Sequence, residues 1–213
     1  MNHENKIQPA LRWWSDQQSK KLFLEAENIR DGLLQESFSI RQSLDILTID
    51  TMNLSIDQIS EYTKKIDKFH HSLVQLSDRL CPVYIQDSLP LSIQCLLDYW
   101  VKSNSHVYFH IDLPGNWQNE PMECNLIVLM ALEELLKITL QRFAKIIATH
   151  ISLKNQEHTK ELTVRITYSD LSTPMFYYNL PELKYLSKTL EFLMSGQCLY
   201  KHQNFRISWH FYW

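Results

Sequence analysis

Residues 56–82 read I-D-Q-I-S-E-Y-T-K-K-I-D-K-F-H-H-S-L-V-Q-L-S-D-R-L-C-P, and this stretch decides the architecture of the first part of the chain. Its apolar side chains recur at alternating steps of three and four residues, at Ile59, Tyr62, Ile66, Phe69, Leu73, Leu76 and Leu80. Such spacing places them on one stripe of an α-helix and is typical of a coiled-coil or bundle seam. Ser55 is the expected N-cap, and Pro82 is expected to end the helix.

The preceding residues predict a second long helix, from about Trp14 to Thr51. Its apolar positions follow the same steps, with one skipped position at Glu36: Leu22, Ala26, Ile29, Leu33, Ile40, Leu44 and Leu47. Two such helices in series form a hairpin, and one hairpin alone leaves its stripes poorly covered. We therefore expect residues 14–82 to form a dimerisation domain, in which two hairpins pair as a homodimeric four-helix bundle.

The pattern changes after Pro82, where helices and strands alternate. We expect a loop at 169–179 and Gly196 as the residue that follows the last helix. The expected helices and strands are a helix at 91–102, a strand at 106–112, a helix at 122–143, strands at 147–153 and 162–168, a helix at 180–194 and a strand at 205–212. This order predicts an α/β sandwich over 83–213 with one mixed or antiparallel sheet, so the fold class of the whole chain is α+β.

The composition of the chain argues against several classes of function. The 213 residues carry a net charge of −3, which gives no electrostatic reason to expect nucleic acid or an anionic membrane as a partner. No apolar run approaches the roughly 20 residues that span a bilayer, and no secretory signal is evident. The four cysteines form no C-x-x-C pair, which favours reduced, buried thiols and a cytoplasmic protein.

Glycine is scarce. The chain contains 3 glycines, whereas average usage of about 7% would give roughly fifteen. Loops that wrap phosphate need glycine for close backbone approach and for positive φ angles. A glycine-rich nucleotide loop therefore cannot be assembled from this sequence, and we expect no cofactor.

Four motifs, in order along the chain, resemble those of histidine kinases of the subfamily paired with helix-turn-helix response regulators. Residues 29–35, I-R-D-G-L-L-Q, resemble the phosphoacceptor motif L-H-D-G-L-x-Q. Residues 78–85 resemble the signature D-L-R-P-x-x-L, and residues 112–115 resemble the strand end before the ATPase helix. Residues 131–145 resemble the N-box, Q-E-A-L-T-N-A-x-K-H-A. The resemblance implies a phosphoacceptor hairpin followed by an ATPase-type α/β sandwich.

The resemblance also shows which catalytic residues are missing. The acceptor histidine is matched by Arg30, which is permanently cationic and cannot take a phosphoryl group. Asp31 and Gln35 of the motif remain, as a surface on which a partner can dock. In the N-box, Glu134 remains but the magnesium-binding asparagine is matched by Ile138, which offers no oxygen.

The family's D-x-G-x-G loop is matched by residues 169–174, S-D-L-S-T-P. Asp170 is the adenine-contacting position that the resemblance implies, but both glycines are absent. These losses together indicate a degenerate histidine kinase without catalytic residues. We expect a non-catalytic pseudokinase that binds a response regulator or a partner histidine kinase and so modulates two-component signalling.

Two alternatives stay open. The hairpin of a phosphotransferase needs a histidine, and only His70 and His71 on the second helix could serve; a phosphatase variant would use Asp31 and Gln35 to orient water. The other alternative is an adaptor unrelated to phosphorelay, which a monomeric state or a first helix packed on its own sandwich would favour. The histidines show no ligand spacing, so we expect no metal site.

Overall fold

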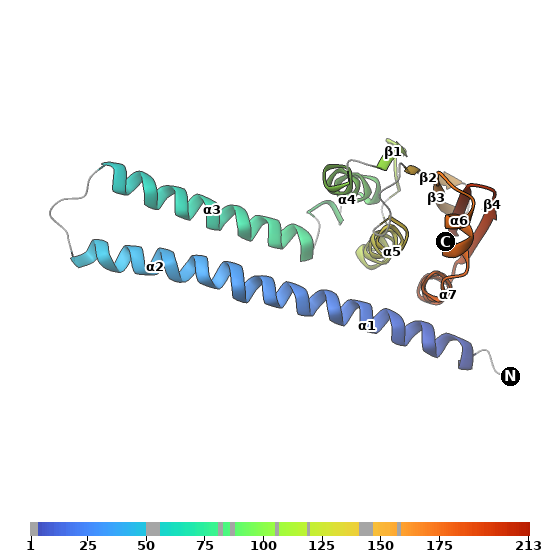
Figure 1. The fold of residues 1–213 in the computed structure, drawn as a ribbon, viewed down its shortest axis with the longest axis horizontal. Helices are drawn as coiled ribbons and strands as arrows, with labels where there is room; N and C mark the ends of the chain where they lie inside the picture. The colour runs from blue at the N-terminus through green and yellow to red at the C-terminus, as the bar shows by residue number, and fades with distance from the viewer. Residues whose placement is uncertain are drawn as a thin grey trace. The chain divides into compact units, whose positions relative to one another are not determined.

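The computed structural model describes residues 4–49, 56–80, 83–85, 88–104, 107–118, 120–140, 147–156 and 159–213. Contacts divide the chain into two compact units, one formed by Asp16–Pro82 and the other by Met1–Ser15 together with Val83–Trp213. Figure 1 shows the helical hairpin and the α/β sandwich. The expected α+β fold class is confirmed. Ser55 and Pro82, the predicted ends of the second helix, lie outside the described residues.

The described part of the hairpin consists of helical segments that run continuously from Glu4 to Ile49 and of one further helix. They are α1 (Glu4–Asn28), a π-helical turn η1 (Ile29–Leu33), α2 (Leu34–Ile49) and α3 (Ile56–Leu80). Lys68 of α3 pairs with Glu36 of α2 at 2.8 Å, which fills the skipped apolar position with an ion pair. The first helix begins ten residues earlier than the sequence predicted, because Pro9 lies near its start and does not break it.

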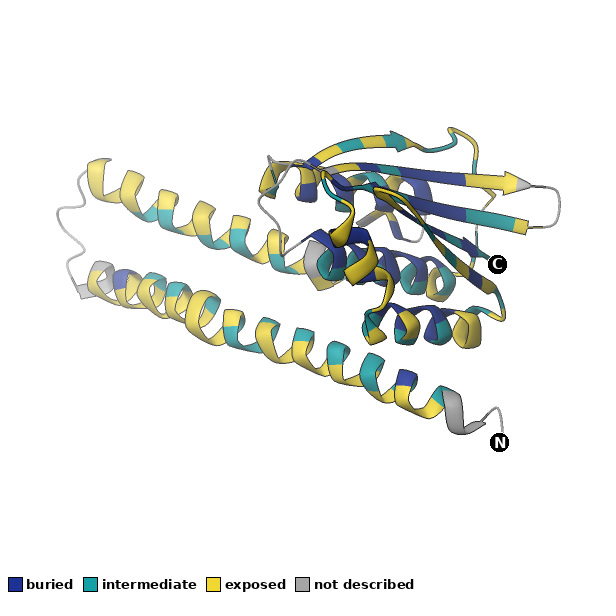
Figure 2. Ribbon diagram, turned by 45° about the vertical axis from the view of Figure 1, so that its right-hand side comes forward, coloured by how far each residue is buried: buried dark blue, intermediate teal, exposed yellow. Residues whose placement is uncertain are grey.

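The sandwich places its helices on one side of a five-stranded mixed sheet (Figure 2). Its helical elements are η2 (Val83–Ile85), α4 (Leu89–Ser103), α5 (Met122–Leu140), α6 (Ser172–Tyr178) and α7 (Pro181–Met194). Its strands are β1 (Val107–Asp112), β2 (Ile147–Gln156), β3 (Thr159–Thr167), β4 (Gln197–Gln203) and β5 (Arg206–Tyr212). The spatial order is β1-β2-β3-β5-β4, with β1 parallel to β2 and every other pair antiparallel.

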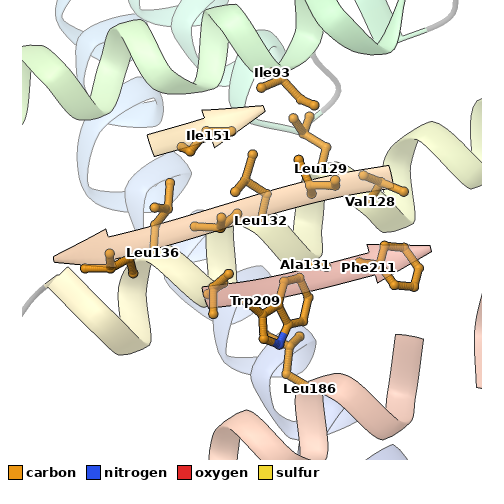
Figure 3. Packing of buried hydrophobic residues seen from close by; sticks show 14 of the residues in the cluster. Ile93, Val128, Leu129, Ala131, Leu132, Leu136, Ile151, Leu186, Trp209 and Phe211 are labelled. Carbon is orange, nitrogen blue, oxygen red and sulfur yellow. The ribbon is translucent and has the colours of Figure 1, made fainter. Parts of the chain in front are cut away.

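The core lies between α5 and the inner face of the sheet. Leu132 and Leu136 of α5 are fully buried and point at Ile151, Trp209 and neighbouring strand residues (Figure 3). A leucine buried in this way stabilises the fold by about 1.5–3 kcal/mol. The buried Asn125 at the start of α5 donates from Nδ2 to the Ile85 carbonyl at 3.0 Å, and so ties η2 to the core.

The start of α1 belongs to the sandwich. Ala10 is completely buried, and its carbonyl accepts a hydrogen bond from the Thr189 hydroxyl of α7 at 3.2 Å. The ring of Trp13 lies 6.1 Å from that of Tyr185, also on α7. Helix α1 therefore contributes residues to both units. That a domain boundary at residue 14 separates two independently folding parts stays a prediction.

The structure differs from the sequence prediction at two places within residues 169–212. The expected loop contains α6, because the Asp170 side chain supplies the hydrogen bonds that a helix start needs. The strand expected at 205–212 is confirmed as β5, but β4 was missed; it pairs with β5 in a hairpin closed at Asn204, whose φ of 49° asparagine tolerates. Phe205 consequently lies in the turn, 45% exposed, instead of on the buried strand face.

The end of α7 also differs from the prediction. Ser195, with φ 51°, takes the left-handed conformation that the sequence assigned to Gly196. Glycine is required at 196 for another reason: a Cβ atom there would collide with the backbone carbonyl of Tyr212 on β5. The close approach lets β4 start directly beside the end of β5.

Candidate functional site

The residues that resemble the phosphoacceptor motif form the π-helical turn. Arg30 and Asp31 lie within η1, and both are exposed, as is Gln35 at the start of α2. The Leu34 amide donates to the Ile29 carbonyl, five residues back. This spacing widens the helix by one residue at the motif itself. Single π-helical turns inside α-helices occur frequently at functional sites.

The N-box positions lie together on α5. Ile138 packs against the hydrophobic core, so the position matched to a magnesium ligand presents a hydrocarbon surface. The ammonium of Lys137 lies 2.9 Å from Glu133 and 3.8 Å from Glu134. Glu134 therefore interacts with a lysine of its own helix, one turn from Ile138.

Asp170 is held by the helix that follows it. Its Oδ1 accepts hydrogen bonds from the amides of Ser172 and Thr173 at 3.1 and 2.9 Å. The two hydroxyls donate to the same carboxylate, Ser172 at 2.7 Å and Thr173 at 2.8 and 2.9 Å. An acceptor with this many donors has little capacity left for an adenine amino group. Asp170 thus acts as the cap of α6.

Aromatic rings fill the region between the end of β3 and α6. Tyr168 and Tyr177 are both buried and stack at 5.5 Å with an interplanar angle of 19°. Burial, with Tyr177 nearby, raises the pKa of the Tyr168 phenol, so it stays neutral. The surface of α6 forms a shallow groove of about 450 Å³ beside these rings, lined by Ser172, Met175, Phe176, Asn179 and Leu180.

The C-terminal aromatic cluster divides between core and surface. Trp209 and Phe211 are buried, whereas His210 and Tyr212 lie on the outer sheet face. The first pair therefore packs into the core, whereas Phe176 of α6 is exposed. No group of histidine, cysteine and acidic side chains in the described ranges is arranged to hold a metal ion.

The possible alternative acceptors, His70 and His71, are both exposed on α3. His71 Nε2 lies 2.9 Å from the Gln75 side-chain amide. The buried Cys198 is a poor nucleophile, because burial raises the pKa of its thiol to about 12. Among the described helices, none combines the length and the hydropathy that crossing a bilayer requires.

No protein-family model matches this sequence, and no curated protein is similar to it. Solved structures do match. The histidine kinase AdeS of Acinetobacter baumannii is 10% identical with a TM-score of 0.39, over 84% of this chain and 95% of AdeS. The histidine kinase domain of the blue-light activated kinase of Erythrobacter litoralis is 8% identical with a TM-score of 0.47, over 92% and 93%. ThkA, solved in complex with the response regulator TrrA, is 10% identical with a TM-score of 0.44, over 94% and 66%. All three are histidine kinases by name.

Proposed function

We propose that this chain is a non-catalytic relative of the histidine kinases, which dimerises through its hairpin and binds a response regulator or a partner histidine kinase. The observation that carries the proposal is the hydrogen bonding of the Asp170 side chain. The one polar residue that remains of the resembled nucleotide loop is occupied by four donor groups of Ser172 and Thr173. A side chain that caps its own helix has a structural role, and the residues that would bind ATP are missing around it.

The other positions of the resembled site support the same conclusion. Ile138 has no oxygen for a magnesium ion, which prefers oxygen ligands in octahedral geometry. The stacked pair Tyr168 and Tyr177 places buried rings next to the position of the absent glycine loop. The exposed guanidinium of Arg30 cannot replace an imidazole as a phosphoryl acceptor.

The hairpin supports a binding role. Two stripes run along α3 at steps of seven residues: one half-buried, at Tyr62, Phe69 and Leu76, and one exposed, at Ile59, Ile66, Leu73 and Leu80. The second stripe remains 41–52% exposed although α2 is present. Apolar side chains exposed at heptad spacing are covered when two hairpins associate as a four-helix bundle. The π-helical turn with Arg30 and Asp31 then offers an accessible, unusual backbone for partner docking.

We expect the purified protein to show no saturable binding of a non-hydrolysable ATP analogue with Mg²⁺ up to about 1 mM, which corresponds to a binding free energy weaker than about 4.1 kcal/mol. We also expect no label after incubation with γ-labelled ATP, because Ile138 cannot hold the magnesium ion and Asp170 cannot hold the adenine base. Isothermal titration calorimetry and autoradiography measure the two results. An authentic histidine kinase is the positive control for both. Micromolar binding, or a labelled protein, would overturn the proposal.

The phosphotransferase alternative is favoured by one observation, the exposure of His70 and His71 on α3. We expect neither the parent protein nor the double variant H70A/H71A to transfer phosphate to or from a response regulator. The substitution should therefore leave phosphotransfer unchanged. A control variant, H202A, removes a histidine from the sandwich. Transfer by the parent that is lost in H70A/H71A and kept in H202A would establish the enzyme instead.

An adaptor unrelated to phosphorelay is favoured by the packing of Ala10 and Trp13 against α7 within the sandwich unit. Only the part of α1 before Asp16 makes these contacts, and the seam residues of the hairpin belong to the other unit. The two functions differ in oligomeric state, since the adaptor needs no second hairpin. Sedimentation equilibrium of the parent protein and of the variant I66D/L73D distinguishes them.

A further inference from the structure

The outer face of the sheet carries no helix in the described part of the sandwich, and most of its residues are polar. Strand residues alternate between the two faces, so every second residue of each strand points away from α5. The inner residues, such as Ile151 and Trp209, are buried, whereas many residues of the outer face are exposed or half-buried (Figure 2). Tyr108 of β1 and Leu199 of β4 are 65% and 48% exposed on this outer face.

Strand pairing aligns one row of side chains straight across all five strands. His110 is paired with His150, His150 with Arg165, Arg165 with Ser208, and Ser208 with Lys201. Neighbouring strands lie about 4.8 Å apart, so the row is long enough to accompany an extended segment of several residues. We call these five residues, with Arg206 two positions from Ser208 on β5, the basic row.

The cations of the basic row lack carboxylate partners. In the part of the chain that the structure describes, Arg165, Lys201 and Arg206 form no ion pair. Of the acidic side chains on this face, Glu161 already contacts His210 at 2.9 Å and accepts a hydrogen bond from Thr163 at 2.8 Å. The other, Asp112, lies on β1 beyond the histidines. A protein with a net charge of −3 thus carries an unneutralised cationic cluster at one place.

We propose that the basic row binds an acidic protein segment, whose carboxylates pair with Arg165, Arg206 and Lys201 around the Ser208 hydroxyl. Guanidinium groups bind carboxylates through two parallel hydrogen bonds, and charge-assisted bonds of this kind are stronger than neutral ones. The site is separate from the resembled nucleotide site, and it does not depend on the function proposed above.

The geometry favours a peptide over single-stranded nucleic acid. Nucleic acid binding on an open sheet uses exposed aromatic faces on which bases stack. Here the rings of His110 and His150 stack on each other at 4.9 Å, and those of His210 and Tyr212 stack at 6.3 Å. One face of each of these rings is already covered by its neighbour, and among the described phenylalanine, tyrosine and tryptophan rings of this sheet face only Tyr108 is largely exposed.

The test is fluorescence anisotropy with a short labelled polyglutamate peptide at low ionic strength. We expect saturable binding to the full chain and a loss of about tenfold or more in affinity in the double variant R165E/K201E, because attraction is replaced by like-charge repulsion. The matched control is K102E/K184E, which makes the same change in net charge at exposed lysines of α4 and α7. We expect the control to bind nearly as well as the parent.

A pH series adds an independent arm. Burial lowers the pKa of His150, and Arg165 and His110 lower it further, while Asp112 opposes them and Lys154 acts with Arg165. A bound carboxylate offsets this repulsion and favours protonated His150, so binding takes up protons. Because the pKa of His150 is lowered from 6.5 in the free protein, affinity should rise mainly as the pH falls below about 6.5. The variant H150Q should flatten this dependence.

Three outcomes would overturn the proposal: no saturable binding of the peptide, equal losses in R165E/K201E and K102E/K184E, or binding of single-stranded RNA in place of the peptide. Circular dichroism checks that each variant is folded. If the charge reversal unfolds the sandwich, the neutral pair R165Q/K201Q decides, with unchanged affinity counting against the proposal.

Discussion

Replacing Ile66 and Leu73 with aspartate is expected to turn a dimeric protein into a monomer. Both residues belong to the exposed stripe of α3, where they are 47% and 41% exposed in a single chain. In a bundle they would be covered by the second hairpin, and an aspartate buried there without a partner is strongly destabilising. We expect the dimer dissociation constant to rise at least about a hundredfold, or roughly 2.8 kcal/mol in association free energy. Sedimentation equilibrium measures the change.

The control for this experiment is S60D/Q75D. Both positions are exposed on α3, away from the two seams, and the substitutions add the same charge. This variant should remain dimeric. A parent protein that is monomeric at all concentrations would favour the adaptor, and equal dissociation of both variants would show that charge alone, and not the stripe, controls association.

Replacing Trp209 with alanine is expected to destabilise the sandwich more than any surface substitution. Trp209 is 1% exposed on β5, and its Nε1 donates to the Ser187 hydroxyl of α7 at 3.2 Å. The substitution opens a cavity between sheet and helix and leaves the buried Ser187 hydroxyl without this donor. Large-to-small changes of this kind cost about 3–5 kcal/mol in the free energy of unfolding. Urea denaturation followed by circular dichroism measures that free energy.

Two variants make the result specific. Trp209→Phe keeps an aromatic ring but removes the N–H group, so its loss should be well below that of alanine. Phe205→Ala removes an aromatic side chain that is 45% exposed in the β4–β5 turn, and it should change the free energy of unfolding by no more than about 0.5 kcal/mol. Similar losses at positions 205 and 209 would contradict the burial of Trp209.

The regular elements of the fold were predictable where a single periodicity dominates. The uninterrupted three-and-four steps of α3 and the alternation of Ile207, Trp209 and Phe211 on β5 each have one physical interpretation. Helix α6 was missed because S-T-P has the composition of a loop, whereas the Asp170 carboxylate supplies the missing helix start. An aspartate followed two and three residues later by hydroxyl residues was the signal that could have revealed it.

The candidate site was predictable as a set of positions, but not as a set of contacts. The sequence indicates that Arg30, Ile138 and Asp170 replace or retain residues of a resembled motif. It does not reveal that Ile29–Leu33 is π-helical, since a one-residue widening leaves no periodic signature over five residues. The basic row could not be predicted from the sequence either, because β3 pairs with β5 and not with its sequence neighbour β4. Arg165 becomes a neighbour of Ser208 only through that crossing of strand order, whereas Lys201 reaches Ser208 through the β4–β5 hairpin.

The burial of Ala10 under α7 makes the sandwich discontinuous along the chain, since residues on either side of the entire hairpin contribute to it. During synthesis the opening turns of α1 emerge long before Thr189, the residue that holds Ala10 in place. All residues of the Asp16–Pro82 unit have been made once α3 has left the ribosome, whereas the opening turns of α1 meet their partner only after α7 has been made. A fragment that starts at residue 83 would lack this end, and would leave part of α7 without its cover.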